Sequence, residues 1–387
     1  MAGYIFSVSK DGWNDFCTNN LSFGYFTPFT IEITENDMTP AKRKARNKIL
    51  AATFGDFITM SPEDNIYFLS DRKIYGIGRL VSIGSDCKYD NYADASALMP
   101  NCRIDPKDYL TTADTRARWV CFFLPAPFLF RKGVDMDDVL KYRPAAFRSL
   151  RAFEGLSFIK IDDEENRALK EFISLKNEES YQDIEGSVFA FHDDVHSRIG
   201  QIDLDPYQMD ISKALLDAEN KEYVFSEMYI ESLLLQVLSK SLSEETFGHW
   251  DYLTHQLIAS PFKPLKYIDK IDIFGYRFST HYDDSPQLIT KYLLIEMKKG
   301  PINSEALEQT MQYIDWICSE YASGDYSKVE AYVVGNRAVR NLRDGISDYC
   351  QRSFISETHP VKSEKWADLQ VVKYDFDNGV SFALIEL

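Results

Sequence analysis

Lys291-Tyr-Leu-Leu-Ile-Glu-Met-Lys-Lys-Gly300 is the stretch that decides the fold of the C-terminal part of the chain. Its nearly unbroken apolar run is typical of a buried β-strand. Glu296 and Lys298 interrupt the run two residues apart, and because strand side chains alternate, the two share one face. A carboxylate and an ammonium group on a buried strand need a partner or a chemical task. The pair therefore marks a candidate functional site.

A second strand is predicted over residues 267–278, with Asp272 inside it. Residues 279–289 form a loop between the two strands, so we expect the strands to pair as a hairpin. That pairing would bring Asp272 within reach of Glu296 and Lys298. Phosphodiester hydrolysis needs a polarised phosphate and an activated water, and Mg²⁺, which supplies both, takes hard oxygen ligands. Two carboxylates beside one lysine meet this requirement.

Two predicted helices flank the hairpin. Residues 224–239 carry apolar side chains at helical spacing and include Glu231. A helix over residues 303–321 places Gln309 and Tyr313, four positions apart, on one face. With three further predicted strands, the order indicates an α/β sandwich with a mixed sheet.

These motifs resemble the PD-(D/E)XK nuclease superfamily over residues 224–340. Asp272 matches the first acidic position, and Glu296-Met-Lys298 matches the E-x-K half of the motif. Gln309-Thr-Met-Gln-Tyr313 is similar to the Q-x3-Y motif of the branch that includes RecB-type, NucS-type and some phage-defence nucleases, among which the Shedu type is a candidate neighbour. The family's proline is missing, because Lys270-Ile271 precedes the aspartate.

The resemblance implies a restriction-endonuclease-like fold and a catalytic set made of Asp272, Glu296, Lys298, Gln309 and Tyr313. It implies Mg²⁺ or Mn²⁺ as cofactor, held by Asp272, Glu296 and Glu231. Lys298 would orient or deprotonate the attacking water, while the glutamine and the tyrosine would contact the phosphate or position the strand. Two alternatives remain: Lys298 simply pairs with Glu296, and Tyr313 is a core residue facing the sheet.

Residues 1–175 contain short, aromatic-rich strand patterns. Their order resembles the EVE domain and related PUA-like small β-barrels, in the opening Tyr4-Ile-Phe6 strand with Trp13 after it and in the Arg118-Trp119 strand. Members of that group bind a base, often a modified one, in an aromatic-lined pocket. The resemblance implies that Trp13 and Trp119 stack on a base, because a flipped base needs an aromatic face. The alternative is that both are core tryptophans of a barrel.

The length of 387 residues predicts more than one domain, here residues 1–175, an acidic linker or subdomain at 176–222, and residues 223–387. The net charge of -17 is unfavourable for a nucleic-acid partner. However, residues 161–232 hold 19 acidic and 6 basic side chains, and so account for -13 of that charge. The parts of the chain before and after this acidic stretch can therefore still bind a polyanion.

No apolar run is long enough to span a membrane and no secretory signal pattern is present, so we expect a soluble cytoplasmic protein with no membrane partner. The six cysteines show no spacing typical of zinc sites. Together these features predict an α/β (α+β) protein that acts as a metal-dependent DNA endonuclease in restriction or anti-phage defence. Double-stranded DNA would be the partner, and cutting both strands predicts a homo-oligomer, a dimer or tetramer. The alternatives are a non-cleaving nucleic-acid-binding protein on the same fold and an RNA nuclease.

Overall fold

The computed structural model shows a mixed α/β chain that contains several mixed sheets. It describes residues 1–28, 39–91, 119–152, 158–181, 187–211, 226–242, 244–259, 269–279, 288–339, 342, 346, 349–376 and 380–385. Contacts divide the chain into two compact units. The first comprises Met1–Lys42 and Met60–Ala214, and the second comprises Arg43–Thr59 and Leu215–Leu387.

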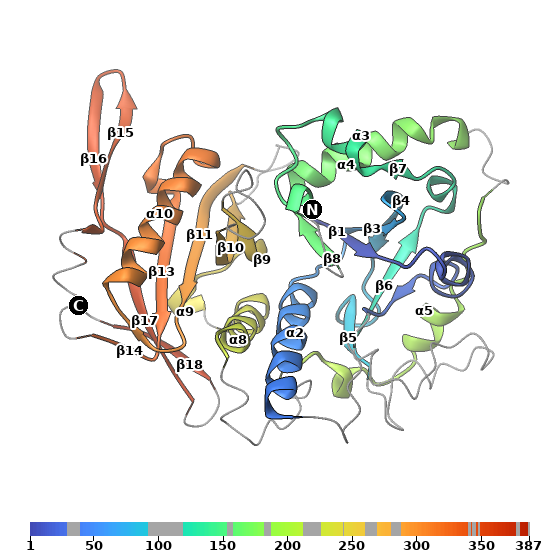
Figure 1. Cartoon of the computed structure of the whole chain (residues 1–387), viewed down its shortest axis with the longest axis horizontal. Coiled ribbons are helices and arrows are strands. Elements are labelled where there is room, and N and C mark those ends of the chain that lie inside the picture. Colours follow the sequence, from blue (N-terminus) through green and yellow to red (C-terminus); the bar gives the residue numbers. More distant parts are fainter. Residues whose placement is uncertain are drawn as a thin grey trace. The chain divides into compact units, whose positions relative to one another are not determined.

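The first unit is built on one curled, mixed sheet (Figure 1). Its main path runs in the order β2-β6-β4-β3-β1-β8, with β5 paired to β6 and β7 to β4. The strands are β1 (Gly3–Ser7), β2 (Tyr25–Phe26), β3 (Asn65–Ser70), β4 (Lys73–Leu80), β5 (Lys88–Asp90), β6 (Trp119–Pro125), β7 (Val134–Asp135) and β8 (Phe158–Ile161). Among these described strands β1 and β3 are the parallel pair, and β2 and β8 end the path without pairing to each other. The sheet is thus a curled half-barrel, and the finer prediction of a PUA-like fold stays a prediction.

Helix α4 (Asp163–Lys176) covers the core of the first unit, together with the short helix α3 (Met136–Tyr142). Asp162 caps α4, because its carboxylate accepts the backbone N–H of Glu165 at 2.9 Å. Glu165 is fully buried and its Oε1 accepts the N–H groups of Arg148 and Leu150 at 2.8 and 3.1 Å. The helix start therefore holds the backbone of Arg148 and Leu150 against α4.

The described part of the acidic middle segment packs onto the first unit. Helix α5 (Asp194–Ile199) buries Val195 and Ile199, which join an aromatic cluster that includes Tyr89 of β5 and Phe122 of β6. Apolar side chains at these few positions anchor the segment although most of its residues are polar.

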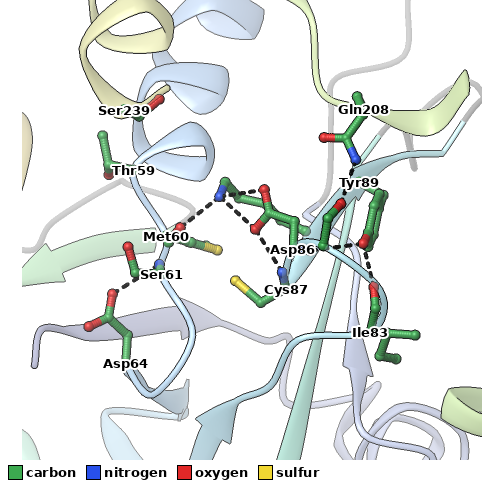
Figure 2. Close-up of polar contacts among 12 residues, drawn as sticks. Thr59, Met60, Ser61, Asp64, Ile83, Asp86, Cys87, Tyr89, Gln208 and Ser239 are labelled. Atoms are coloured by element: carbon green, nitrogen blue, oxygen red, sulfur yellow. Dashed lines mark hydrogen bonds and ion pairs between the residues drawn. The ribbon is translucent and has the colours of Figure 1, made fainter. Parts of the chain in front are cut away.

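Polar contacts gather around Met60, Asp86 and Tyr89, at the point where the chain re-enters the first unit (Figure 2), and include the buried Lys88. Lys88 Nζ donates to the Met60 carbonyl at 2.7 Å and to the Asp86 carboxylate at 2.9 Å. Beside it, the Tyr89 hydroxyl accepts the Asp86 N–H and donates to the Ile83 carbonyl. A buried charge is tolerated when it is paired and hydrogen-bonded, as it is here.

The second unit is built on a six-stranded mixed sheet in the order β18-β17-β13-β11-β10-β9. Its strands are β9 (Tyr252–Ile258), β10 (Lys270–Phe278), β11 (Ile289–Met297), β13 (Val329–Gly335), β17 (Leu369–Asp375) and β18 (Ser381–Leu384). β10 and β11 pair antiparallel, which confirms the predicted hairpin. β11, β13 and β17 are parallel, and β9 is an edge strand that the sequence patterns did not reveal.

Helices lie against both faces of this sheet (Figure 1). α10 (Ser304–Glu320) packs on β11 and β13, and the Asn303 side chain caps it by accepting the Ala306 N–H at 3.0 Å. α8 (Glu227–Ser239) packs on β9, β10 and β11, and Ser226 caps it as its sequence suggests. The expected order of helix, strand pair, helix and strand is present in the described residues, but α9 (Glu244–Phe247) and β9 are inserted between the first helix and the strand pair.

Most of helix α2 (Pro40–Ile58), from Arg43 onward, belongs to the second unit, although the helix lies between β2 and β3 of the first in the sequence. Ser232 of α8 donates to the Ala51 carbonyl at 2.6 Å, and His255 of β9 contacts the Ala52 carbonyl at 2.7 Å. No local pattern reveals such a docking, because the partners are nearly two hundred residues away.

Two small pieces complete the second unit. β12 (Pro301–Ile302) pairs with β14 (Arg337–Ala338), and β15 (Arg352–Thr358) forms a separate exposed hairpin with β16 (Val361–Trp366). Trp366 anchors the base of the hairpin by donating to the Val329 carbonyl at 3.0 Å. None of the helices described is both long enough and apolar enough to cross a bilayer.

Candidate functional site

The register of β10 and β11 brings the two strand carboxylates together. Ile273 lies opposite Ile295, so Asp272 and Glu296 occupy adjacent positions on the same face. Asp272 Oδ2 accepts the backbone N–H of Met297 at 2.7 Å, which fixes its side chain across the strand pair. The predicted pair is thus formed by the hairpin itself.

A chain of hydrogen bonds links Glu296 to α10. Lys298 Nζ donates to Glu296 Oε1 at 2.6 Å and to Gln309 Oε1 at 3.2 Å. Gln309 Nε2 then donates to the Tyr313 hydroxyl at 2.9 Å. Glu296 is only 1% exposed, whereas the Lys298 side chain is 27% exposed, so the lysine lies where the site opens to solvent. The Q-x3-Y pair therefore holds the lysine, and Tyr313 is buried as well as hydrogen-bonded.

Glu231 enters the site from α8 and meets a residue that the sequence analysis missed. Gln256 Nε2, on β9, lies 3.2 Å from both carboxylate oxygens of Glu231 and 3.4 Å from Asp272 Oδ1. One amide group therefore bridges the carboxylates of two elements. Nothing in the sequence signals this role, because a single glutamine in a strand is unremarkable until its neighbours are known.

His255, to which the sequence analysis gave no role, lies behind Glu231. Its Nε2 is 2.7 Å from the Ala52 carbonyl, which orients the ring and leaves Nδ1 facing Glu231 Oε1 at 3.9 Å. Nδ1 is buried and has no hydrogen-bond partner within the described residues. The ring also lies 3.5 Å from Asp56 of α2, so α2 contributes to the support of the site.

Burial and mutual repulsion raise the pKa values of the carboxyl groups. Burial, then the nearby charge of Asp272, raises the pKa of Glu296 to about 8 and the pKa of Glu231 well above its ordinary value. Burial raises the pKa of Asp272 to about 6, although its bond to the Met297 N–H opposes the shift. Burial lowers the pKa of Lys298, but its bond to Glu296 and the surrounding negative charge outweigh burial and raise it. The cluster thus favours added positive charge.

The donor set suits a hard divalent cation, but hydrogen-bond donors of the chain already contact several of the carboxylate oxygens. Glu296 Oε2 is buried and lacks a hydrogen-bond partner among the residues described, so one carboxylate oxygen is available. However, no group of three His, Cys, Asp or Glu side chains in the described ranges is arranged to hold a metal ion. The Gln256 amide lies between Glu231 and Asp272, and Lys298 occupies one oxygen of Glu296.

The two tryptophans proposed as base-stacking residues differ in exposure. Trp13 is half-buried, and its ring lies 4.4 Å from the ring of Tyr75, centroid to centroid. Trp119 is 0% exposed, within β6. The structure therefore offers a partly open aromatic pair at Trp13 and encloses Trp119 in the core.

Comparisons of the chain with protein-family models, with curated proteins and with solved structures find no significant similarity in any of the three. A function for this chain can therefore be inferred only from the geometry of the site.

Proposed function

We propose that the second unit is a Mg²⁺- or Mn²⁺-dependent endonuclease that hydrolyses DNA. The observation that carries the proposal is the convergence of Asp272, Glu296 and Lys298 at one end of a strand pair, with the lysine held by Gln309 of the next helix. Buried carboxylates that repel one another destabilise the folded state. A bound cation would offset this repulsion, which gives the cluster a functional explanation.

Each side chain has a task in this proposal. When bound, a divalent cation would neutralise the phosphate and make a water nucleophilic near neutral pH. Asp272 and Glu296 supply oxygen ligands, and Glu231 supports them from α8. Lys298, as an ammonium ion at the solvent-facing side, donates to a phosphate oxygen as negative charge develops. Gln309 keeps the lysine in place, and Tyr313 keeps the glutamine in place.

The proposed partner of the protein is nucleic acid. The first unit would act as a PUA-like reader of nucleic acid, including a modified base, and would serve restriction or anti-phage defence in the cytoplasm. Double-stranded cutting would need two active sites and hence a dimer or tetramer, which light scattering on the purified chain would reveal.

A second candidate is supported by the hydrogen bonds that already engage the carboxylates. Because no ready-made three-residue metal site is found in the part of the chain that the structure describes, a nuclease-like unit that binds nucleic acid without cleaving it remains a candidate. Cleavage of RNA in place of DNA is a further outcome of the same experiment.

The experiment incubates the full chain with supercoiled plasmid, linear DNA, modified DNA and RNA in Mg²⁺ or Mn²⁺. We expect cleavage of DNA that EDTA stops and that Glu296→Gln, which keeps the shape of the side chain, abolishes. Cleavage that survives this substitution would refute the site. Binding without cleavage of any substrate would favour the second candidate.

A reader role for Trp13 predicts a specific loss on substitution. Trp13→Ala should weaken binding of the preferred nucleic acid roughly tenfold, because stacking on one base contributes about 1–3 kcal/mol. Fluorescence anisotropy with labelled oligonucleotides measures the change, with basal cutting of plasmid as the control. Trp119→Ala should instead lower stability by about 3–5 kcal/mol, as expected for a buried tryptophan. Unchanged affinity in a folded Trp13→Ala protein would remove Trp13 from the reader site.

A further inference from the structure

The backbone conformation of Gln256 differs from that of a regular β-strand. Its φ is 54°, in the left-handed region that residues other than glycine seldom adopt. The β9–β10 ladder pairs Leu257 with Ile271 and His255 with Ile273, but omits the pair between them, Gln256 and Asp272. The chain is therefore distorted at the residue that faces the candidate metal ligand. Strain of this kind persists only where the surroundings enforce it, and it gathers at functional sites.

The distortion places the Gln256 amide between the carboxylates of Glu231 and Asp272. Its nitrogen is equidistant, at 3.2 Å, from the two oxygens of Glu231, which is where a carboxylate binds a cation with both oxygens. The same nitrogen is 3.4 Å from Asp272 Oδ1. An amide donates two hydrogens and carries no net charge, so it can satisfy both carboxylates without ionic ligands.

We propose that Gln256 is a placeholder: its amide occupies the cation position between Glu231 and Asp272 and must be displaced when the metal binds. This inference rests on the proposed function, since it concerns the same site. It makes Gln256 a positioning residue that lowers the cation affinity of the free protein. Glu296 Oε2, which is buried and has no hydrogen-bond partner among the described residues, is a further oxygen donor in the same cluster.

Mn²⁺ binding to the full chain tests the placeholder without any measurement of catalysis. Free Mn²⁺ is followed by electron paramagnetic resonance for the wild type, Gln256→Ala and Gln256→Asn. Asparagine tolerates the left-handed backbone and withdraws the amide by one methylene, so it keeps the test valid if the alanine variant fails to fold. Gln370→Ala, at an exposed position on β17 of the same sheet, is the matched control.

We expect the folded Gln256 variants to bind Mn²⁺ at least threefold more tightly than the wild type, and Gln370→Ala to equal it. Equal or weaker binding by the Gln256 variants overturns the placeholder. Glu296→Gln separates the two claims: if it abolishes wild-type binding while the Gln256 variants show no gain, the metal site stands and the placeholder fails. If neither the wild type nor a Gln256 variant binds Mn²⁺, both claims fail.

Discussion

Lys298→Ala is expected to slow DNA cleavage about 10²–10³-fold while Mn²⁺ binding is kept. The magnitude is that of removing one preorganised donor from a transition state in which negative charge develops. Lys298 Nζ contacts Glu296 and Gln309, and the 27% exposure of its side chain lets it reach a bound phosphate. Single-turnover cleavage of supercoiled plasmid measures the rate, and electron paramagnetic resonance of Mn²⁺ measures the binding.

Lys299→Ala is the matched control for this prediction, because Lys299 is exposed and adjacent in sequence. Its backbone N–H, which donates to Glu227 at 3.2 Å, is retained in the variant. We expect its cleavage rate to stay within about twofold of the wild type, as for a surface charge that makes no contact in the transition state. If the Lys298→Ala protein cuts DNA as fast as Lys299→Ala, Lys298 is only an ion-pair partner of Glu296 and takes no part in cleavage.

The second large effect is on the pH dependence of stability in the first unit. Burial, then the charge of Asp162, raises the pKa of Glu165 to about 8. The unfolded chain ionises this group near its ordinary pKa of 4.5, so the folded state binds more protons between pH 4.5 and 8. The contribution of Glu165 to the free energy of unfolding is therefore fully present below about pH 4.5 and is lost as the pH rises to 8. Since one pKa unit corresponds to about 1.4 kcal/mol, the loss from pH 5 to 8 is on the order of 3 kcal/mol.

Glu165→Gln should remove most of this pH dependence. The glutamine keeps an oxygen for the N–H groups of Arg148 and Leu150 and cannot ionise. Urea unfolding at pH 5 and pH 8, followed by tryptophan fluorescence, measures the difference, with Glu178→Gln at an exposed position as the control. If Glu165→Gln and the wild type lose the same stability between the two pH values, Glu165 is not the group responsible.

The sequence predicts the hairpin and the carboxylate pair well, because both follow from local patterns. Alternation places Glu296 and Lys298 on one face, and the loop expected between two apolar strands favours their antiparallel pairing, which the structure confirms. The four-residue spacing of Gln309 and Tyr313 likewise places them on one face of α10. What the structure adds there is that Gln309 holds Lys298.

Features that depend on distant contacts could not be predicted in this way. α2 docks in the second unit through Ala51 and Ala52, which carry no signal of their own. β9 contains Thr254, His255 and Gln256 in its middle, so its apolar pattern is broken at the residues that serve the site. The polar composition that obscured this strand is the same feature that brings Gln256 to Glu231 and Asp272.

The most direct test of the metal site is anomalous diffraction from crystals of the full chain soaked in Mn²⁺. We expect a peak in the Asp272–Glu296 cluster, within about 2.0–2.6 Å of a carboxylate oxygen of each residue. We also expect that the Gln256 amide has moved from its place beside Glu231. A crystal saturated with Mn²⁺ that shows no peak in this cluster, from protein that still cleaves DNA, would contradict the account.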